Sequence, residues 1–394
     1  MARLTYKFRL YPSACQKKKI EQHIFAVRFL YNRLIEDRTA FYRKMKQWKK
    51  LDVKPFIDEQ KWNMLDQRAL KGAENSVRIA YRYFFNISRD ELRYRKESIE
   101  KNANDPTYEL LDSDAEFYPR IKTKKTRESY STSKNVRLLE KHAYLPCVGS
   151  VRAVFHRQIP ENAKILYYTV LRNPSDEYYL LVHFEVPDEE KKDQIKTILG
   201  VALTPGKLAV RSDDVSVDFR HISEKQQKQI DKAYQTLCRR VPGSKRYEKQ
   251  RKRLAALYEH RANQRRDDLY KTVQNITDSC DMIMAETPNV RQRQGALKRL
   301  GEYEIVLDEA WYLFIKMLQN KANQKGLLFF RVPQIIPIYK RCSACGSMTA
   351  GHTRDKNLWI CPECGAELPL SKNAAYNLEK SGERYIGLFD NPNS

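Results

Sequence analysis

Residues 342–345 read CSAC, residues 361–364 read CPEC, and the chain continues at 370–375 with LSKNAA. Each C-x-x-C turn can direct two thiolates toward one point, and two such turns joined by a return loop are typical of a zinc ribbon. We therefore predict a structural zinc ion held by Cys342, Cys345, Cys361 and Cys364. Four thiolates leave no open coordination position, so we assign His352 no ligand role. The alternative is a loop of reduced thiols without metal.

The other cysteines have no paired spacing. We expect Cys15, Cys147, Cys238 and Cys280 to be small buried apolar residues. The isolated histidines have no carboxylate or cysteine constellation near them in sequence, so none is assigned a catalytic role.

The composition points to a polyanionic partner. The chain has 394 residues, enough for two to four domains, and 73 Lys and Arg against 49 Asp and Glu give a net charge of +24. Such a charge attracts nucleic acid or an anionic membrane surface. No apolar run approaches a spanning length and the first residues contain no apolar signal segment, so we expect no membrane partner and a cytoplasmic location. The 24 tyrosines suit stacking on bases, although aromatic residues also fill cores.

The N-terminal part predicts one strand followed by helices. Apolar and basic residues alternate from Leu4 to Leu10, which is the period of a strand with one basic face, and Pro12 ends it. Ser13 can cap a following helix, and a second helical periodicity runs from Leu65 to Phe84. Residues 13 to about 118 therefore form a predicted helical insertion.

The stretch from Pro119 to Arg137 is basic, rich in Ser and Thr, and too polar to bury, which predicts a loop contacting phosphates. A solvated linker is the alternative. Strands are predicted after it at 165–172 and 178–186, where a turn at 173–176 makes a hairpin. Together with the first strand, they could close one barrel-like domain.

A different domain is predicted to begin with a hairpin at 198–210. Residues 224 to 278 read as long, polar and helical, with one apolar edge on a basic surface. Further along we expect a buried strand at 281–286 that ends in a carboxylate, a helix at 305–323, a strand at 327–332 and a closing helix at 371–380.

The order of these pieces resembles TnpB, the RNA-guided nuclease family of bacterial transposons related to type V CRISPR effectors. The resemblance covers nearly the whole chain. It rests on Tyr6 to Pro12, Arg28 to Asn32, Phe117 to Lys122, Arg265-Arg266-Asp267, Ala285-Glu286, Ala310-Trp311, and the cysteine ribbon followed by Asn373-Ala374-Ala375-Tyr376-Asn377.

The resemblance implies an RNase H-like RuvC domain, in which three carboxylates hold two magnesium ions. The chain departs from that pattern at two positions. Ala202 follows Gly200-Val201 where the family has an aspartate, and Ser371 stands two residues before Asn373 where the third acid is expected. Only Glu286 remains at its place, and we expect it to be structural or vestigial. Magnesium relies on carboxylates, so we expect no catalytic magnesium and no hydrolysis.

Acids elsewhere in the chain could in principle replace the missing ligands. Asp213, Asp214 and Asp218 follow the hairpin, and at about 3.3 Å per residue they are expected to lie too far from Ala202.

The resemblance gives an α/β multidomain fold. We expect a barrel-like wedge domain at 1–12 and 119–190, a helical recognition domain at 13–118, an RNase H-like (RuvC) domain at 191–336 and 369–385, a zinc ribbon at 337–368 and a tail at 386–394.

The function implied is RNA-guided binding of double-stranded DNA without cleavage, similar to the nuclease-dead TnpB-like repressors (TldR), which would block a promoter. The partners would be a guide RNA and target DNA beside a short flanking motif, in the bacterial cytoplasm at the nucleoid. The candidate nucleic-acid contacts are Lys7, Arg9, Lys122, Lys124, Lys125, Arg127, Lys134, Arg137, Arg261, Arg265 and Arg266. Two alternatives stay open: a diverged TnpB nuclease with relocated metal ligands, and an accessory factor that binds RNA or DNA without guidance.

Overall fold

The computed structural model describes residues 2–45, 51–85, 118–123, 128–187, 194–204, 208–218, 223–287, 311–333, 336–348 and 358–390. The chain forms two compact units, one comprising Arg3–Val186 and the other Pro187–Ser394 with the first two residues. Each unit is described separately.

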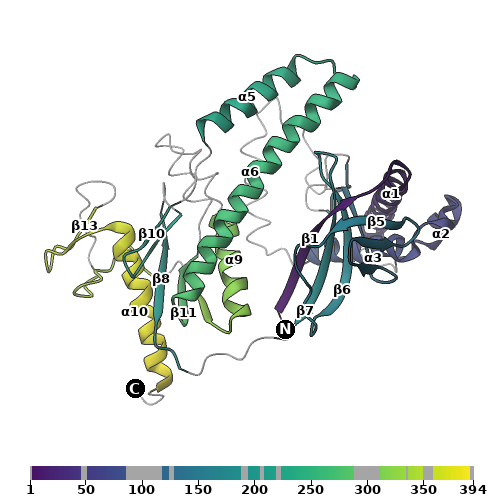
Figure 1. Ribbon diagram of the computed structural model, residues 1–394. Coiled ribbons are helices and arrows are strands. Elements are labelled where there is room, and N and C mark those ends of the chain that lie inside the picture. Colours follow the sequence, from purple (N-terminus) through teal and green to yellow (C-terminus); the bar gives the residue numbers. More distant parts are fainter. Residues whose placement is uncertain are drawn as a thin grey trace. The chain divides into compact units, whose positions relative to one another are not determined.

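The unit of residues 3–186 is built on a seven-stranded sheet (Figure 1). Its strands are β1 (Ala2–Tyr11), β2 (Glu128–Thr132), β3 (Arg137–Leu139), β4 (His142–Leu145), β5 (Gly149–Val154), β6 (Lys164–Arg172) and β7 (Tyr178–Val186), in the order β2-β6-β7-β1-β5-β4-β3. The predicted hairpin is confirmed, since β6 pairs with β7 in antiparallel register. Asp176 has a φ of 69° in its turn, a conformation that Asp tolerates better than most residues.

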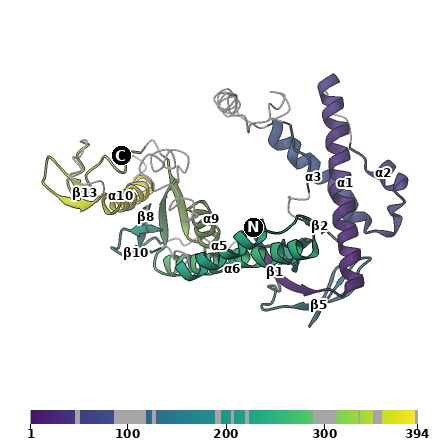
Figure 2. The same cartoon turned by 90° about the horizontal axis from the view of Figure 1, so that it is seen from above.

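Helices cover this sheet and share its core. They are α1 (Ala14–Met45), α2 (Lys54–Glu59), the 3-10 turn η1 (Trp62–Met64) and α3 (Gln67–Phe85). Ser13 and Gln16 form a reciprocal cap at the start of α1, as the sequence predicts for Ser13. Leu30 and Leu34 of α1 and Leu70 and Val77 of α3 are buried, and the two helices lie side by side (Figure 2).

The prediction that residues 119–137 are a loop too polar to bury is wrong for part of that segment. Glu128–Thr132 forms β2, which pairs with β6 at the edge of the sheet. The side chains of this strand alternate between the core and the other face of the sheet, since Tyr130 and Thr132 are 2% and 3% exposed while Ser129 and Ser131 face the other way. This alternation explains why so polar a segment forms a strand.

The second unit contains a five-stranded sheet in the order β10-β9-β8-β11-β12. Its strands are β8 (Ile198–Leu203), β9 (Ala209–Arg211), β10 (Ser216–Val217), β11 (Met282–Glu286) and β12 (Leu328–Val332). The hairpin predicted at 198–210 is confirmed, since β8 pairs with β9 in antiparallel register, and the strands predicted at 281–286 and 327–332 are confirmed as β11 and β12. Strands β8, β11 and β12 run parallel, and β9 pairs antiparallel with both β8 and β10.

The helices of this unit are α5 (Glu224–Cys238), α6 (Lys245–Asp278), α9 (Trp311–Gln324) and α10 (Leu370–Asp390). The predicted continuous helix at 224–278 is therefore two helices, which lie side by side (Figure 1). Pro242 cannot supply a helical N–H, Gly243 has a φ of +83°, and Ser244 caps α6. The closing helix also runs past Lys380, since α10 ends at Asp390.

The ribbon segment contains the short hairpin β13 (Leu358–Ile360) and β14 (Glu367–Pro369). The expectation of buried cysteines outside the ribbon is wrong for Cys15, Cys147 and Cys238, which are exposed, and confirmed for Cys280. Among the described helices, none has the length and apolar character needed to cross a membrane.

Candidate functional site

The positions of the three expected acids fall at one end of the five-stranded sheet. In the parallel register Ala285 lies opposite Val201, so the next residues along the two strands, Glu286 at the end of β11 and Ala202 one residue before the end of β8, lie side by side. Both are on the sheet face covered by α10, because Ala202 packs with Ala374 and Leu378 of that helix.

We call the region around Ala202, Glu286 and Ser371 the Glu286 corner. Close contact between α10 and β8 fixes its geometry. A Cβ at Gly200 would lie 2.0 Å from the Ala375 carbonyl oxygen and 2.9 Å from the Glu379 backbone nitrogen. Glycine is therefore required at position 200. Ser371 lies one helical turn before Ala375, on the same face of α10, which directs position 371 toward the ends of β8 and β11.

Glu286 is tied into the fold. Its side chain is only 7% exposed, and its Oε2 accepts hydrogen bonds from the Leu203 backbone N–H at 2.9 Å and from the Tyr339 hydroxyl at 2.7 Å. The carboxylate thus links β11 to the end of β8 and to the segment that leads into the ribbon. A buried carboxylate needs such donors, and two of them offset part of its desolvation.

The acids considered as substitutes have partners of their own. Asp213 forms an ion pair with Arg211. Asp214 contacts the Lys372 ammonium at 2.9 Å and the Tyr376 hydroxyl at 2.6 Å, and the Tyr376 hydrogen bond holds the pKa of the Asp214 carboxyl below its usual value. Asp218 accepts a long contact from the Ser216 hydroxyl at 3.5 Å.

The four ribbon cysteines converge as a metal site requires. Their sulfur atoms all lie within 4.8 Å of one another, with Sγ–Sγ distances of 3.7 Å for Cys342–Cys364 and for Cys345–Cys361. Zinc–sulfur bonds of about 2.3 Å in a tetrahedron place sulfurs about 3.8 Å apart, so the set fits zinc. Across the described residues, this is the one cluster of three or more His, Cys, Asp or Glu side chains with metal-binding geometry.

The two cysteine turns are built alike. Gly346 N–H donates to the Cys342 carbonyl and Gly365 N–H to the Cys361 carbonyl, both at 2.9 Å, and these glycines have φ values of +80° and +69°. Positive φ at each turn favours glycine. Ser347 lies 3.5 Å from the Cys361 sulfur, and its hydrogen bonding is the largest cause that lowers the pKa of that thiol to about 6, which favours the thiolate.

Two asparagines of α10 form hydrogen bonds with residues 338–343, the segment that leads into the ribbon. Asn373 accepts from the Ser343 N–H at 2.8 Å and donates to the Arg341 carbonyl at 2.8 Å. Asn377, one turn later, donates to the carbonyls of Ile338 at 2.9 Å and Arg341 at 2.7 Å. The two amides therefore fix the segment that carries Tyr339 against α10.

The basic side chains predicted on the first strand contact residues of the neighbouring strand β7 and of the turn before it. The Lys7 ammonium lies 3.7 Å from the centre of the Tyr179 ring. Arg9 pairs with Glu177 and donates to the Tyr179 hydroxyl at 2.8 Å. These contacts hold both cations against β7 and leave them half-buried.

The predicted phosphate loop is placed in part. Lys122 lies with its ammonium 3.9 Å from the Tyr31 ring centre, and burial lowers its pKa. Asn32 of α1 exchanges hydrogen bonds with the Lys122 backbone at 2.7 and 2.9 Å. Lys134 is exposed, and Arg137, also exposed, lies 4.9 Å from the Tyr144 ring centre. Lys124, Lys125 and Arg127, like His352, lie outside the described residues.

The long helix α6 presents the remaining candidates. Arg261 and Arg265 are half-buried and Arg266 is exposed. Lys7, Arg9, Lys122, Lys134 and Arg137 belong to the unit of residues 3–186, and the α6 arginines belong to the other unit.

Sequence reasoning missed Tyr339, Ser347 and the amide roles of Asn373 and Asn377. The Asn-x-x-x-Asn spacing was a usable signal, because it places two amides on one helical face. Nothing in the sequence around Tyr339 marks it as the partner of a carboxylate 53 positions away.

Three family models match parts of the chain: a model described as "Probable transposase" (OrfB_IS605) at residues 182–295, a "Helix-turn-helix domain" of the same family at residues 1–47, and a "Cas12f1-like, TNB domain" at residues 311–378. The second description does not fit the local structure here, since the described part of 1–47 is the strand β1 and the single helix α1. These matches relate the chain to the IS605-type OrfB proteins that include TnpB, and to Cas12f1-like proteins.

Two curated relatives match over most of their length. "Putative RNA-guided DNA endonuclease InsQ" of Escherichia coli (strain K12) is 23% identical, with 97% of this chain and 92% of InsQ covered. "Putative RNA-guided DNA endonuclease" of Streptomyces pristinaespiralis is 22% identical, with 96% and 89% covered. Among solved structures, a Cas12f1–sgRNA–target DNA complex aligns with a TM-score of 0.46 and 14% identity over 96% of this chain and 98% of that one.

Proposed function

We propose that this protein binds double-stranded DNA under the direction of a guide RNA, does not cut it, and represses transcription by occupying a promoter, as in the TldR subgroup. One observation carries the proposal. At the strand ends where three carboxylates would have to converge on metal ions, the chain has a methyl group at Ala202, a hydroxyl at Ser371, and a single carboxylate, Glu286, already bonded to Leu203 and Tyr339.

The domain assignment behind this proposal is RNase H-like, with the RuvC-like domain at 191–336 and 369–385. Three parallel strands, β8, β11 and β12, continued at the β8 edge by the antiparallel pairs of β9 with β8 and β10, and α10 packed on β8, support this assignment. Two-metal hydrolysis requires anions to offset the dehydration of each magnesium ion. With two of three ligands neutral, affinity for those ions falls, and the reaction is lost with it.

Binding does not need the lost acids. The net charge of +24 favours polyanions, and both relatives are named for RNA-guided activity on DNA. In this proposal guide–target pairing selects the sequence, while the protein recognises a short flanking motif and holds the backbone. The wedge domain at 1–12 and 119–190 and the helical domain at 13–118 would read the motif, and the basic residues of 122–137 and of α6 would contact phosphates.

The decisive experiment uses the ribonucleoprotein purified with its own RNA. Sequencing should give one abundant RNA with a constant part and a variable end. A duplex that matches the variable end and carries the flanking motif should shift in a gel and stay intact in magnesium, whereas a duplex mismatched beside the motif should not shift. Cleavage of the matched duplex would refute the nuclease-dead part, and a heterogeneous RNA population would refute guidance.

A second candidate function is supported by the names of the two relatives, both endonucleases. In that case the chain would be a diverged nuclease whose metal ligands come from other acids. Nicking assays with magnesium and with manganese distinguish the two candidates, with the Glu286→Gln variant as the matched control. A nick that is lost in Glu286→Gln while binding of the duplex and the melting temperature are retained favours the enzyme.

The repressor role has its own readout. A reporter gene whose promoter contains the matched sequence should lose expression when the protein and its RNA are present. Moving the matched sequence far upstream of the promoter should restore expression, because the block is steric. Equal repression from both positions would contradict promoter occlusion.

A further inference from the structure

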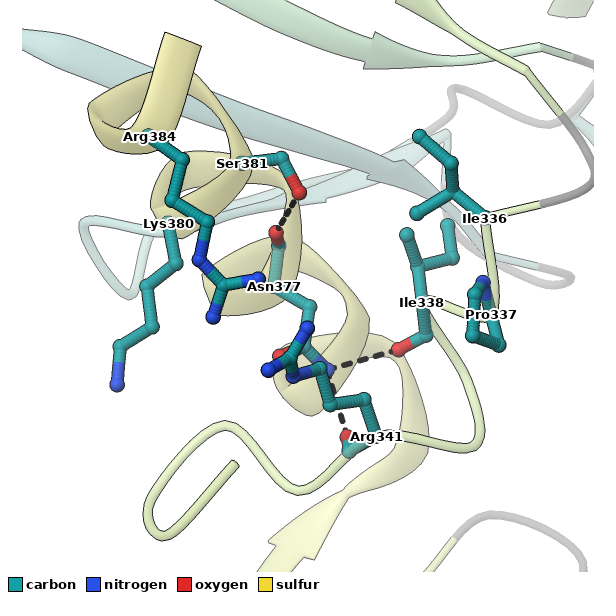
Figure 3. A pocket seen from close by; sticks show the side chains of 8 residues that line it. All are labelled: Ile336, Pro337, Ile338, Arg341, Asn377, Lys380, Ser381 and Arg384. Carbon is teal, nitrogen blue, oxygen red and sulfur yellow. Dashed lines mark hydrogen bonds between the residues drawn. The ribbon is translucent and has the colours of Figure 1, made fainter. Parts of the chain in front are cut away.

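A basic pocket of about 220 Å³ lies between α10 and the segment 336–341 that leads into the ribbon. Figure 3 shows Arg341 on one wall and Lys380 and Arg384 on the helical wall, with Ile336, Pro337 and Ile338 opposite the helix. Among the described residues, no acidic side chain lines it. The pocket belongs neither to the cysteine cluster nor to the Glu286 corner.

The walls of this pocket are fixed to each other. Asn377, at its base, donates to the carbonyls of Ile338 and Arg341, and the Ser381 hydroxyl donates to the Asn377 carbonyl at 2.6 Å (Figure 3). Lys380 donates to the Ser343 carbonyl. A pocket held by such bonds is already formed before a ligand arrives, which lowers the entropic cost of binding.

The acids of α10 lie to one side of these cations, and of the three cations Lys380 is the one that interacts electrostatically with Glu379. Residues 377, 380, 381 and 384 share one helical face, whereas Glu379 and Glu383 fall on a neighbouring face. Across the part of the chain that the structure describes, neither Arg341 nor Arg384 has a carboxylate at ion-pair distance. Like charges four residues apart, as at Lys380 and Arg384, destabilise a helix unless an anion lies between them.

We propose that this pocket binds one phosphodiester group of a nucleic-acid backbone, an inference that rests on the proposed function. Two guanidinium groups can each offer paired N–H donors to phosphate oxygens, and the Lys380 ammonium adds a third positive charge. The Ile336–Ile338 wall suits the apolar edge of the adjoining sugar. Because the contact is to the backbone, it fixes the position of the strand and does not read sequence.

The test measures binding of generic probes to the full chain by fluorescence anisotropy, at several salt concentrations. The probes are a labelled oligo(U), a labelled oligo(dT) and a labelled 20-bp duplex. The double variant Arg341→Gln/Arg384→Gln should bind at least one probe roughly ten- to a hundredfold more weakly. The slope of log affinity against log salt should shrink by about 0.7 for a single strand or about 0.9 for a duplex.

Two matched variants control the result. Arg239→Gln/Arg240→Gln removes the same charge from exposed positions at the end of α5 and should change the slope less. Arg341→Lys/Arg384→Lys keeps the charge and should retain most of the slope while losing part of the affinity, because paired donors are lost. Circular dichroism melting identifies any variant that fails to fold.

The outcomes separate this inference from the proposed function. A slope change specific to the pocket variant supports the phosphate site, and the probe most affected identifies RNA or DNA as its source. An unchanged slope for every probe, or an equal loss in the α5 control, overturns it. The generic probes need no guide, so failure of guided recognition would leave this measurement valid, and failure here would leave guided recognition open.

Discussion

Introducing aspartates at positions 202 and 371, on either side of Glu286, should create a site whose stability depends on divalent cations. The perturbation is Ala202→Asp/Ser371→Asp. Ala202 is fully buried against α10, beside the carboxylate of Glu286, so without metal the new aspartate at 202 is a buried charge next to a like charge. Leaving such a charge uncompensated costs about 3–5 kcal/mol. For a unit of this size that corresponds to a melting temperature lower by roughly 6–20 °C in EDTA.

Magnesium should reverse much of this loss. An ion that binds only the folded state at about 100 times its dissociation constant returns about 2.7 kcal/mol. Burial and the neighbouring Glu286 should raise the pKa of the carboxyl introduced at position 202. The loss of stability should therefore be present at neutral pH and become smaller as the pH falls through that raised pKa, because the carboxyl group then becomes neutral. The assay is thermal unfolding followed by circular dichroism in EDTA, in magnesium and at pH 5 to 8.

The matched control is Ala285→Asp. Ala285 is also fully buried but packs on the opposite face of the sheet, so it should show the same deficit in EDTA and no rescue by magnesium. The wild-type protein should melt at the same temperature with and without magnesium. If magnesium stabilises the wild-type protein as strongly as the double variant, the chain already holds catalytic ions at this corner and the reasoning fails.

Three further predictions follow from the same corner and from the ribbon. Gly200→Ala should cost about 3 kcal/mol or more in thermal unfolding, because backbone atoms of α10 occupy the space of the new methyl; a cost below about 1 kcal/mol would contradict the close packing. Tyr339→Phe removes one hydrogen-bond donor from the buried Glu286 carboxylate and should lower the free energy of unfolding by about 1–3 kcal/mol in chemical denaturation. An unchanged free energy of unfolding would contradict this role, because it would mean that water replaces the hydroxyl at that oxygen. A chelator should remove one zinc ion per chain, as measured by a colorimetric assay. Loss of the ion should expose Trp359, which is buried in the ribbon, to a fluorescence quencher. Unaltered quenching of Trp359 after metal loss would contradict a fold that the metal supports.

Local chemistry made much of this architecture predictable. The Ser13 cap, the turn at 173–176 and the buried strand β11 each depend on residues close together in sequence, and each prediction is confirmed. The break between α5 and α6 could also have been predicted, since Pro242 and Gly243 are strong helix terminators. We predicted one helix because the apolar edge continues on either side of these residues. There the periodicity was given more weight than the termination signal.

Features that depend on distant partners could not be predicted. Strand β2 is short and polar, and it exists because β6 offers a paired edge and a core for Tyr130. The exposed Cys147 has a φ of 59° in the turn before β5, a demand of turn geometry that outweighs the tendency of cysteine to be buried. The positions of Ala202 and Ser371 were noticed through family resemblance, since an alanine and a serine carry no signal of their own.

The hydrogen bonds of Glu286 give this buried glutamate a structural role of its own. A buried carboxylate can be satisfied by neutral donors if enough of them converge, and the Leu203 N–H and the Tyr339 hydroxyl do so from two segments far apart in sequence. The Tyr339 hydroxyl reaches this point because Asn373 and Asn377 fix its segment to α10, and α10 in turn lies close to β8 because residue 200 is glycine. Glu286 therefore acts as a structural link among β8, β11 and the ribbon entrance. Removing its charge should loosen the ribbon and the neighbouring basic pocket together, which couples Glu286 to the surface proposed to hold nucleic acid.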